Sequence, residues 1–392
     1  MSALRKLHLD RLVHAAQSAQ KTSVMAVDAS LGSYAWFFRV LAFVLGATVG
    51  SFLNVCIYRL PLGLSVNEPR RSFCPACKKQ IPWQQNLPLL SWFLLRGRCA
   101  SCGSRIAFRY FAVELLTALL FLSVWLYFPW SVAIAYWILV SLLIVATFID
   151  FEHFIIPDEI TIGGTVAGVL ASAAVPALMM TDRRWSAVLA SLLSAALGYA
   201  LLWIVLEAGK RAFGKKRIRL NAPTAFTWTR AGEDAEFVVG DERAPWSEHF
   251  ARESDLLIME CDAAQIDARD LGAVTLTFHY HDVRAGAETW SLDAIEKIHG
   301  VVRELQIPRE AMGRGDLKFL AAIGAFLGWR AVLFSVFAGS LAGSVIGLFT
   351  MLIGKRVWSA KLPFGPYLAL GALGWTFCGE ALMRWYVGLL YP

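Results

Sequence analysis

Apolar residues fill eight long segments of the chain, and more polar stretches separate them. Most of these segments approach the roughly 20 residues that an α-helix needs to cross the hydrocarbon core of a bilayer. The sixth is short, so it is expected to be tilted, partly re-entrant or packed inside the bundle. The pattern predicts an α-helical polytopic membrane protein with about eight transmembrane helices. The predicted spans cover residues 35–57, 110–128, 130–149, 160–180, 186–207, 317–329, 331–353 and 364–389.

Residues 212–310, between the fifth and sixth apolar segments, follow a different pattern. Runs such as TAFTWTRA, AEFVVG, LLIMEC and AVTLTFHYHDV alternate apolar and polar positions and are rich in β-branched and aromatic residues, which predicts strands. A helix is expected to follow at about 292–305, with Ser291 or Asp293 as its cap. We therefore predict a small β-rich (α+β) domain inserted between two sets of spans.

The composition indicates that lipid is the solvent of most of the chain. Of its 392 residues, 57% are hydrophobic and 17% charged, whereas soluble domains carry about 25% charged residues. The net charge of +7 comes from basic residues gathered in a few loops, which indicates membrane topology and excludes a nucleic-acid partner.

Lysine and arginine predict which side each loop faces. The loop 58–109 holds nine of them against one acidic residue, Glu68, and the loops 209–315 and 354–363 are also basic. If the N-terminus lies on the outer side, all three loops are cytoplasmic, as the positive-inside rule requires. The tail 1–34, which carries Arg5, Lys6 and Arg11, then lies on the outer side and does not follow that rule. The predicted parts are the tail (1–34), the first span (35–57), a cytoplasmic loop (58–109), spans two to five (110–211), the cytoplasmic insert (212–310) and the last three spans (311–392).

Two C-x2-C pairs in the loop 58–109 are separated by 21 residues. Each pair places two thiolates on one side of a tight turn, and four thiolates complete a tetrahedral zinc site. A cytoplasmic position disfavours disulfides; unrelated thiols or two redox-active pairs are the alternatives. Four sulfur ligands leave no position for water, so the zinc is expected to be structural. The predicted ligands are Cys74, Cys77, Cys99 and Cys102.

Two aspartates lie at the ends of apolar segments. Asp150 ends the third segment, and Asp316 follows Gly313-Arg314-Gly315 and precedes the sixth. Taken singly, each is equally well explained by a structural role, such as a helix cap. Together, the topology places both at the cytoplasmic membrane face, where two close carboxylates cannot both ionise. One can then take a proton from water while the other donates one, as in an aspartyl protease.

Five stretches follow one another along the chain: GSFLNVCIYRLP (50–61), the cysteine loop through ELLTALL, IDFEHFIIPDEIT, GRGDLK and LPFGPYLALG (362–371). Together and in this order they resemble the type IV prepilin peptidases, a family of G-x-G-D intramembrane aspartyl proteases. The resemblance implies removal of the short basic leader of prepilins or pseudopilins at the cytoplasmic face of the bacterial inner membrane. It assigns catalysis to Asp150 and Asp316, with Gly313, Gly315 and Lys318 in the G-x-G-D-x-K block.

The cysteine loop resembles that of members that also methylate the new N-terminal amine with S-adenosylmethionine. Gly97, Arg109, Tyr110 and Glu114 stand at matching motif positions, which implies cofactor binding. No glycine-rich nucleotide fingerprint accompanies them, so methylation follows from the resemblance alone. A further interpretation is that Glu152, Asp158 and Glu159 attract the basic leader; plain interfacial solvation explains them equally well.

The insert 212–310 departs from the family pattern, because it separates the two catalytic blocks. Asp316 can reach Asp150 only if the ends of the insert lie close together. Three other readings stay open: a proton-coupled transporter, a non-catalytic scaffold with a zinc ribbon, and a peptidase without methyltransferase activity. The sequence specifies neither the particular prepilin substrate nor the oligomeric state.

Overall fold

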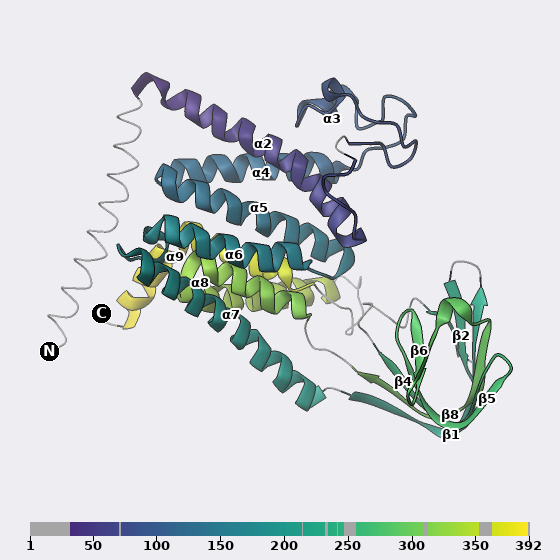
Figure 1. Ribbon diagram of the computed structural model, residues 1–392. Helices are drawn as coiled ribbons and strands as arrows, with labels where there is room; N and C mark the ends of the chain where they lie inside the picture. The colour runs from purple at the N-terminus through teal and green to yellow at the C-terminus, as the bar shows by residue number, and fades with distance from the viewer. Residues whose placement is uncertain are drawn as a thin grey trace. The chain divides into compact units, whose positions relative to one another are not determined.

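Figure 1 shows a computed structural model of the chain, which describes residues 32–69, 72–213, 215–231, 234–240, 242–246, 256–308, 313–352 and 363–390. Nearly all of the tail 1–34 and of the loop 354–363, with their basic residues, lies outside the described residues. The chain divides into two compact units, residues 1–200 with 314–392 and residues 201–313.

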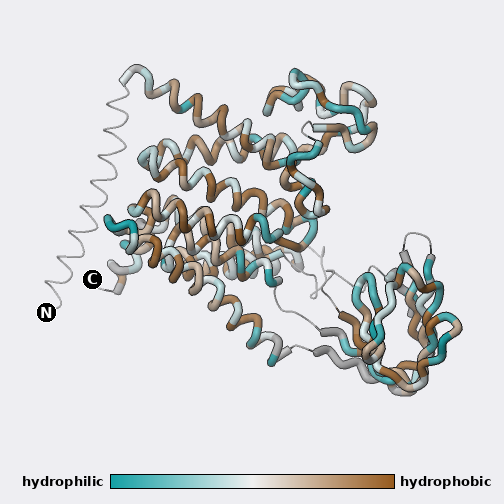
Figure 2. The backbone as a smooth tube through the Cα atoms, in the orientation of Figure 1, coloured by the Kyte–Doolittle hydropathy of each residue, from teal (hydrophilic) through white to brown (hydrophobic). Residues whose placement is uncertain are grey.

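Helices occupy all eight segments predicted to span the membrane, and hydrophobic residues run along them (Figure 2). The sixth and seventh segments lie in one long helix, α8, which Gly328 interrupts with non-helical torsions (φ 81°, ψ 174°). By length and hydropathy, five of the described helices could cross a membrane. The count of eight spans stays a prediction. The helices are α2 (Ala35–Arg59), α4 (Phe108–Tyr127), α5 (Trp130–His153), α6 (Asp158–Ala174), α7 (Arg184–Phe213), α8 (Arg314–Leu352) and α9 (Gly365–Leu390).

Glycines allow the backbones of neighbouring helices to touch. A Cβ at Gly46 or Gly50 of α2 would lie 2.8 Å from a backbone atom of α4, and one at Gly198 of α7 would lie 2.7 Å from the carbonyl oxygen of Leu320 in α8. Small residues one helical turn apart are typical of close helix packing in membranes, where van der Waals contact replaces hydrophobic burial. These contacts hold α2 against α4 and α7 against the first half of α8.

The loop between α2 and α4 contains little regular structure. Two short β-bridges, Phe73 with Gln80 and Arg98 with Arg105, each enclose one C-x2-C pair. The backbone takes positive φ at Lys78 (φ 59°) and Gly103 (φ 71°), where each of the two loops reverses. The short helices in this unit are η1 (Gly32–Tyr34), η2 (Leu60–Leu62), η3 (Trp83–Gln85), α3 (Leu90–Leu94) and η4 (Pro176–Met179).

The insert forms a strongly curled antiparallel sheet in the order β3-β2-β1-β8-β4-β5-β6-β7. Its concave face encloses a buried core that includes Phe226, Met259 and Ile298. Trp246, just after β3, packs its ring 5.3 Å from that of Phe278 at the end of β5, so the sheet folds back on itself. The strands are β1 (Lys215–Ala231), β2 (Asp234–Val239), β3 (Glu242–Pro245), β4 (Leu257–Ile266), β5 (Arg269–Phe278), β6 (Asp282–Ala285), β7 (Glu288–Ser291) and β8 (Lys297–Pro308).

The prediction of a helix at 292–305 is wrong. Only a 3-10 turn, η6 (Leu292–Ala294), is present there, with the Ser291 hydroxyl accepting the amide N–H of Asp293, and β8 follows. β8 is a central strand between β1 and β4, and it buries Ile298 and Val302. A Cβ at Gly300 would lie 2.1 Å from the carbonyl oxygen of Ala263, so only glycine fits. Glycine and adjacent valines were the missed strand signals. Apart from the end of α7, the described insert is therefore β-structure.

The two ends of the insert lie side by side. β1 and β8 pair antiparallel, with Lys215 opposite Pro308. Paired strands lie about 5 Å apart, so the first and last strands of the insert place its two ends close together. This is the condition that the sequence required for Asp316 to reach Asp150.

Candidate functional site

Asp150 lies near the C-terminal end of α5 and is only 4% exposed. Its Oδ2 accepts a hydrogen bond of 2.9 Å from the backbone N–H of Gly365, the first residue of α9. The N-terminus of a helix offers unpaired N–H groups and a positive dipole end, which suits a carboxylate. Pro366 follows Gly365, and proline is favoured in the first turn because it needs no N–H partner there. α9 therefore positions one oxygen of Asp150.

Asp316 lies in the first turn of α8 and is 5% exposed. The segments that carry the two aspartates meet at Ile156, which is buried in the connection from α5 to α6. A Cβ at Gly315 would lie 3.1 Å from the Cβ of Ile156. A Cβ at Gly365 would lie 2.9 Å from Ile156 Cδ1 and 2.7 Å from Asp150 Oδ2. Both glycines thus permit close approach, and the two carboxyl-bearing segments gather at one end of the bundle.

Lys318 ties α8 to the start of α6. Its Nζ lies 2.6 Å from Oδ1 of Asp158, and both side chains are partly or largely exposed. Asp158 is the first residue of α6, and no side chain caps this helix; the carboxylate of Asp158 pairs with Lys318. Gly313, the remaining predicted supporting residue, directly precedes α8 and is partly buried.

Glu152, two residues after Asp150, pairs with Arg109 at the start of α4. Of the three acids proposed to attract a basic leader, Glu152 and Asp158 thus each have a basic partner within the chain. Glu159 is exposed beside them. Two of these three acidic residues therefore form ion pairs that join neighbouring helices at this edge.

The four predicted zinc ligands come together. Their Sγ atoms all lie within 4.8 Å of one another, and Zn–S bonds of about 2.3 Å at tetrahedral angles require sulfurs roughly 4 Å apart. Hydrogen bonds from the backbone of Cys77 and the side chain of Ser104 lower the pKa of the Cys74 thiol to about 6. The Ser104 hydroxyl also lowers the pKa of Cys102. The pKa of Cys77 is instead raised to about 11. Its backbone hydrogen bond with Lys79 lowers this pKa, but desolvation and the neighbouring Cys102 and Cys74 thiols together outweigh that bond. Thiolates are the form that binds metal, and the spacing of the four sulfur atoms fits a zinc ion.

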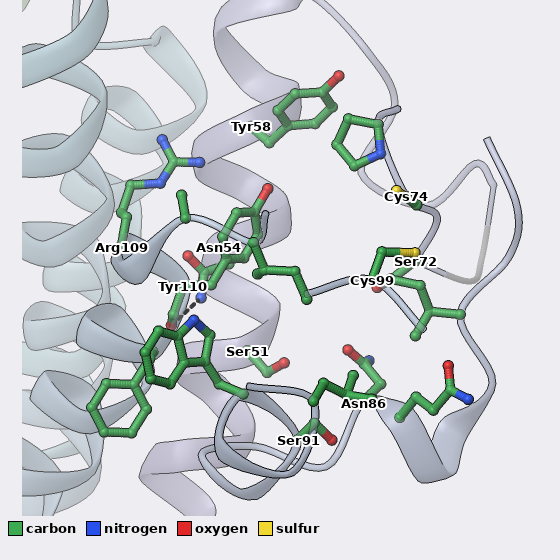
Figure 3. A pocket seen from close by; sticks show the side chains of 18 of the residues that line it. Ser51, Asn54, Tyr58, Ser72, Cys74, Asn86, Ser91, Cys99, Arg109 and Tyr110 are labelled. Atoms are coloured by element: carbon green, nitrogen blue, oxygen red, sulfur yellow. Dashed lines mark hydrogen bonds between the residues drawn. The ribbon is translucent and has the colours of Figure 1, made fainter. Parts of the chain in front are cut away.

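A cavity of about 500 Å³ lies between the cysteine loop and the ends of α2 and α4 (Figure 3). From α2 it is lined by Ser51, Asn54 and Tyr58, which share one helical face. The loop contributes Cys74 and Cys99, so the cysteine cluster forms part of its wall. Glu152 also lines it, which places the end of α5 at its edge.

Three of the four residues predicted to bind the cofactor line this cavity, namely Arg109, Tyr110 and Glu114. Glu114 Oε2 accepts the backbone N–H of Leu89 at 2.7 Å and so fixes the loop that leads into α3. Gly97 is not among the lining residues. It adopts φ +64°, and a Cβ there would approach the ring of Trp92 to 3.2 Å. Gly97 thus makes room for Trp92, which does line the cavity.

Three polar atoms of cavity-lining residues are buried without a hydrogen-bond partner among the described residues. They are Asn54 Oδ1, Trp92 Nε1 and Arg109 Nε. A buried polar atom without a partner costs about 1–3 kcal/mol, so such atoms mark where a ligand would bind. One acceptor and two donors fit a ligand with amino, carboxylate and purine groups.

Sequence reasoning missed the N–H of Gly365, the role of Ile156 and the pair of Arg109 with Glu152. The Gly-Pro pair at the start of the last apolar segment is a helix-start signal, and it could have indicated the N–H of Gly365. The others join segments far apart in the sequence, and no local pattern reports such contacts.

Two family models match the chain. "Bacterial Peptidase A24 N-terminal domain" covers residues 44–128, which include the cysteine loop and the cavity. "Type IV leader peptidase family" covers residues 137–222 and 305–348. The second match passes over 223–304, so the curled sheet is an addition to the family pattern. No solved structure matches the chain.

The chain is similar to known proteins over nearly its full length. A "Prepilin leader peptidase/N-methyltransferase" of Legionella pneumophila is 26% identical over 92% of this chain and 99% of its own length. One of the same name from Aeromonas hydrophila is 28% identical over 90% and 94%. A "Type 4 prepilin-like proteins leader peptide-processing enzyme" of Escherichia coli O78:H11 is 38% identical over 47% of this chain and 74% of its own length.

Proposed function

Because this chain belongs to the type IV leader peptidase family, we propose that it cleaves the leader from prepilins or pseudopilins with Asp150 and Asp316. It also methylates the newly exposed N-terminal amine, in the cavity beside the cysteine cluster. Both reactions take place at the cytoplasmic face of the bacterial inner membrane, and the lipid bilayer surrounds the helical unit.

Cleavage requires only a water molecule and two carboxyl groups. The ionised carboxylate takes a proton from water, which attacks the scissile carbonyl, while the protonated carboxyl group donates to the substrate. The two groups titrate as a coupled pair, so neither role belongs to one residue. The N–H of Gly365 orients Asp150, and Gly315 lets the chain before Asp316 pass close to Ile156.

The convergence of both aspartate-bearing segments on Ile156 carries this proposal. Asp150 and Asp316 are both buried to about 5% exposure at helix ends in one compact unit. Buried carboxyl groups are costly unless they are partnered or functional. A transporter would instead place its carboxylates near mid-membrane, whereas these lie beside the paired residues Glu152 and Asp158 at the ends of their helices.

Methylation is assigned to the cavity lined by Arg109, Tyr110 and Glu114. S-adenosylmethionine supplies an electrophilic methyl group on a sulfonium sulfur. Asn54, Trp92 and Arg109 offer the buried polar atoms that would hold its polar groups. Glu114 keeps the loop before α3 in place. Glu152, on the helix of Asp150, links this cavity to the peptidase residues.

A zinc ion held by Cys74, Cys77, Cys99 and Cys102 has a structural part in this scheme. It would cross-link the two knuckles of the loop and thereby shape the wall of the cavity.

The test uses the purified full-length protein in lipid nanodiscs with a candidate prepilin. Asp150→Asn and Asp316→Asn are each expected to lower the rate of leader removal about a hundredfold or more, read as a shift in substrate size. Asp182→Asn, an exposed acid in the connection between α6 and α7, is the matched control and should cleave normally.

Methyl transfer to a synthetic peptide with the mature pilin N-terminus checks folding, because Asp150→Asn and Asp316→Asn should both retain it. Normal cleavage by either variant would refute the assignment. Mass spectrometry of the processed pilin tests directly for the methyl group. An unmethylated N-terminus would mean that the protein has peptidase activity but no methyltransferase activity.

A further inference from the structure

The short helix α3 has apolar residues on both of its sides. Trp92 and Leu95 line the cavity, and Ser91 is buried. Leu90, Phe93 and Leu94 point elsewhere and are 60%, 60% and 74% exposed. Their i, i+3, i+4 spacing places them on one face. A cytoplasmic loop that faced only water would gain nothing from such a face.

This exposed face continues onto a membrane helix. The ring of Phe93 lies 4.9 Å from that of Phe111 in α4, and Phe111 contacts Phe108, which is 61% exposed. Further along α4, Leu116 and Leu119 are also exposed. α4 is long and apolar enough to span a bilayer. In Figure 1, α3 lies at the end of the bundle where α2 ends and α4 begins.

The charge around this face has one sign. Arg96, Arg98 and Arg105 are exposed, and the sequence from 72 to 107 contains no aspartate or glutamate. Basic groups beside an apolar face are attracted to the anionic phospholipids of a cytoplasmic leaflet. Trp83 of η3, 71% exposed, adds an aromatic residue of the kind that is enriched at membrane interfaces.

We propose that α3 lies in the cytoplasmic headgroup region of the bilayer, with Leu90, Phe93 and Leu94 against lipid. Trp92, on the opposite side of the same helix, lines the cavity. The thickness of this one short helix then separates the cavity from the membrane. This inference goes beyond the proposed function and shares with it only the cytoplasmic side of the cysteine loop; it further requires that α4 spans the membrane. It makes the cysteine loop a membrane-surface domain rather than a free cytoplasmic one.

Photo-crosslinking of the full-length protein tests this arrangement. A benzophenone amino acid replaces Leu94, the protein is placed in nanodiscs that contain anionic phosphatidylglycerol, and mass spectrometry identifies the adduct after irradiation. We expect phospholipid adducts at position 94. The matched control places the same amino acid at Gln80, an exposed polar position of the same loop, where lipid adducts should be at least about fivefold fewer.

The same amino acid is also placed at Leu90, in case the variant at Leu94 fails to fold. Leader cleavage by each variant shows whether it is folded. Equal lipid adducts at Leu90 and Gln80, or adducts of a prepilin instead of lipid when substrate is present, would overturn the proposal. Loss of leader cleavage in Asp150→Asn bears on the proposed function alone and leaves these adducts unchanged.

Discussion

At the scale of single residues, the site depends on the absence of side chains as much as on the carboxyl groups. Gly365 donates its N–H to Asp150 and also lacks the Cβ that would lie 2.7 Å from the accepting oxygen. Gly315 allows the chain before Asp316 to pass Ile156. The position of each carboxyl group is thus set by backbone that approaches closely, which side chains larger than hydrogen would prevent.

Gly365→Ala is expected to displace the Asp150 carboxylate and weaken its hydrogen bond. A hydrogen bond to a charged group contributes about 1.5–3 kcal/mol, so kcat for leader cleavage should fall about ten- to hundredfold. Gly374→Ala in the same helix is the control, because its Cβ would meet only an ordinary contact at 3.6 Å from Phe334. An unchanged kcat in Gly365→Ala would show that this amide does not position Asp150.

At the scale of elements, two ion pairs connect the helix ends to which we assign the two reactions. Lys318 with Asp158 joins α8 to α6, and Arg109 with Glu152 joins α4 to α5. Exposed ion pairs contribute only about 0.2–1 kcal/mol each, so their effect lies in positioning rather than in stability.

Reversing the Lys318–Asp158 pair separates a positioning role from a substrate contact. Lys318→Asp alone places two acids at the starts of α6 and α8, and cleavage should slow several-fold. The double variant Lys318→Asp with Asp158→Lys restores the attraction and should recover most of the rate. The measurement is a double-mutant cycle on kcat/KM for leader removal. A double variant as slow as the single one would contradict the positioning role.

The cysteine knuckles form a second element whose loss should affect one reaction only. Cys102→Ser should lower bound zinc, measured by elemental analysis, and reduce methyl transfer at least about tenfold, because Cys74 and Cys99 wall the cavity. Leader cleavage should change little. Cys378→Ser, an exposed isolated cysteine in α9, is the control and should keep its zinc. Equal loss of both activities would argue against separate sites.

At the scale of the whole molecule, the chain carries an eight-stranded sheet that its family model passes over. The start of β1 pairs with the end of β8, so the insert begins and ends at neighbouring positions. α7 and α8 remain in direct contact through Gly198 and Leu320 in the helical unit.

Replacing residues 216–307 with a short Gly/Ser linker is therefore expected to preserve the peptidase. Neighbouring strands lie about 5 Å apart, and a few flexible residues span that distance. The shortened protein should cleave prepilin at a rate within about threefold of the full chain, measured in the same nanodiscs. Complete loss of cleavage, with methyl transfer intact, would show that the insert is needed to deliver Asp316.

Several features could be predicted from local sequence alone. Eight apolar segments became helices because each carries enough apolar residues for its length, and the short sixth segment ends at Gly328, where the backbone leaves helical torsions. The two cysteines of each C-x2-C pair are close because that spacing fixes a turn locally, and the two turns then meet so that all four sulfur atoms lie together. The helix predicted at 292–305 failed because a central position in the sheet outweighed local helix propensity.

Only the tertiary structure decided which of these segments meet. It selected Gly365 as the donor to Asp150, Ile156 as the residue against which Gly315 and Gly365 pack, and Glu152 as the partner of Arg109. Patterns along a chain record what each residue does to its near neighbours. Close approach between helices is determined instead by shape at distant positions, which becomes visible only when the backbones are packed.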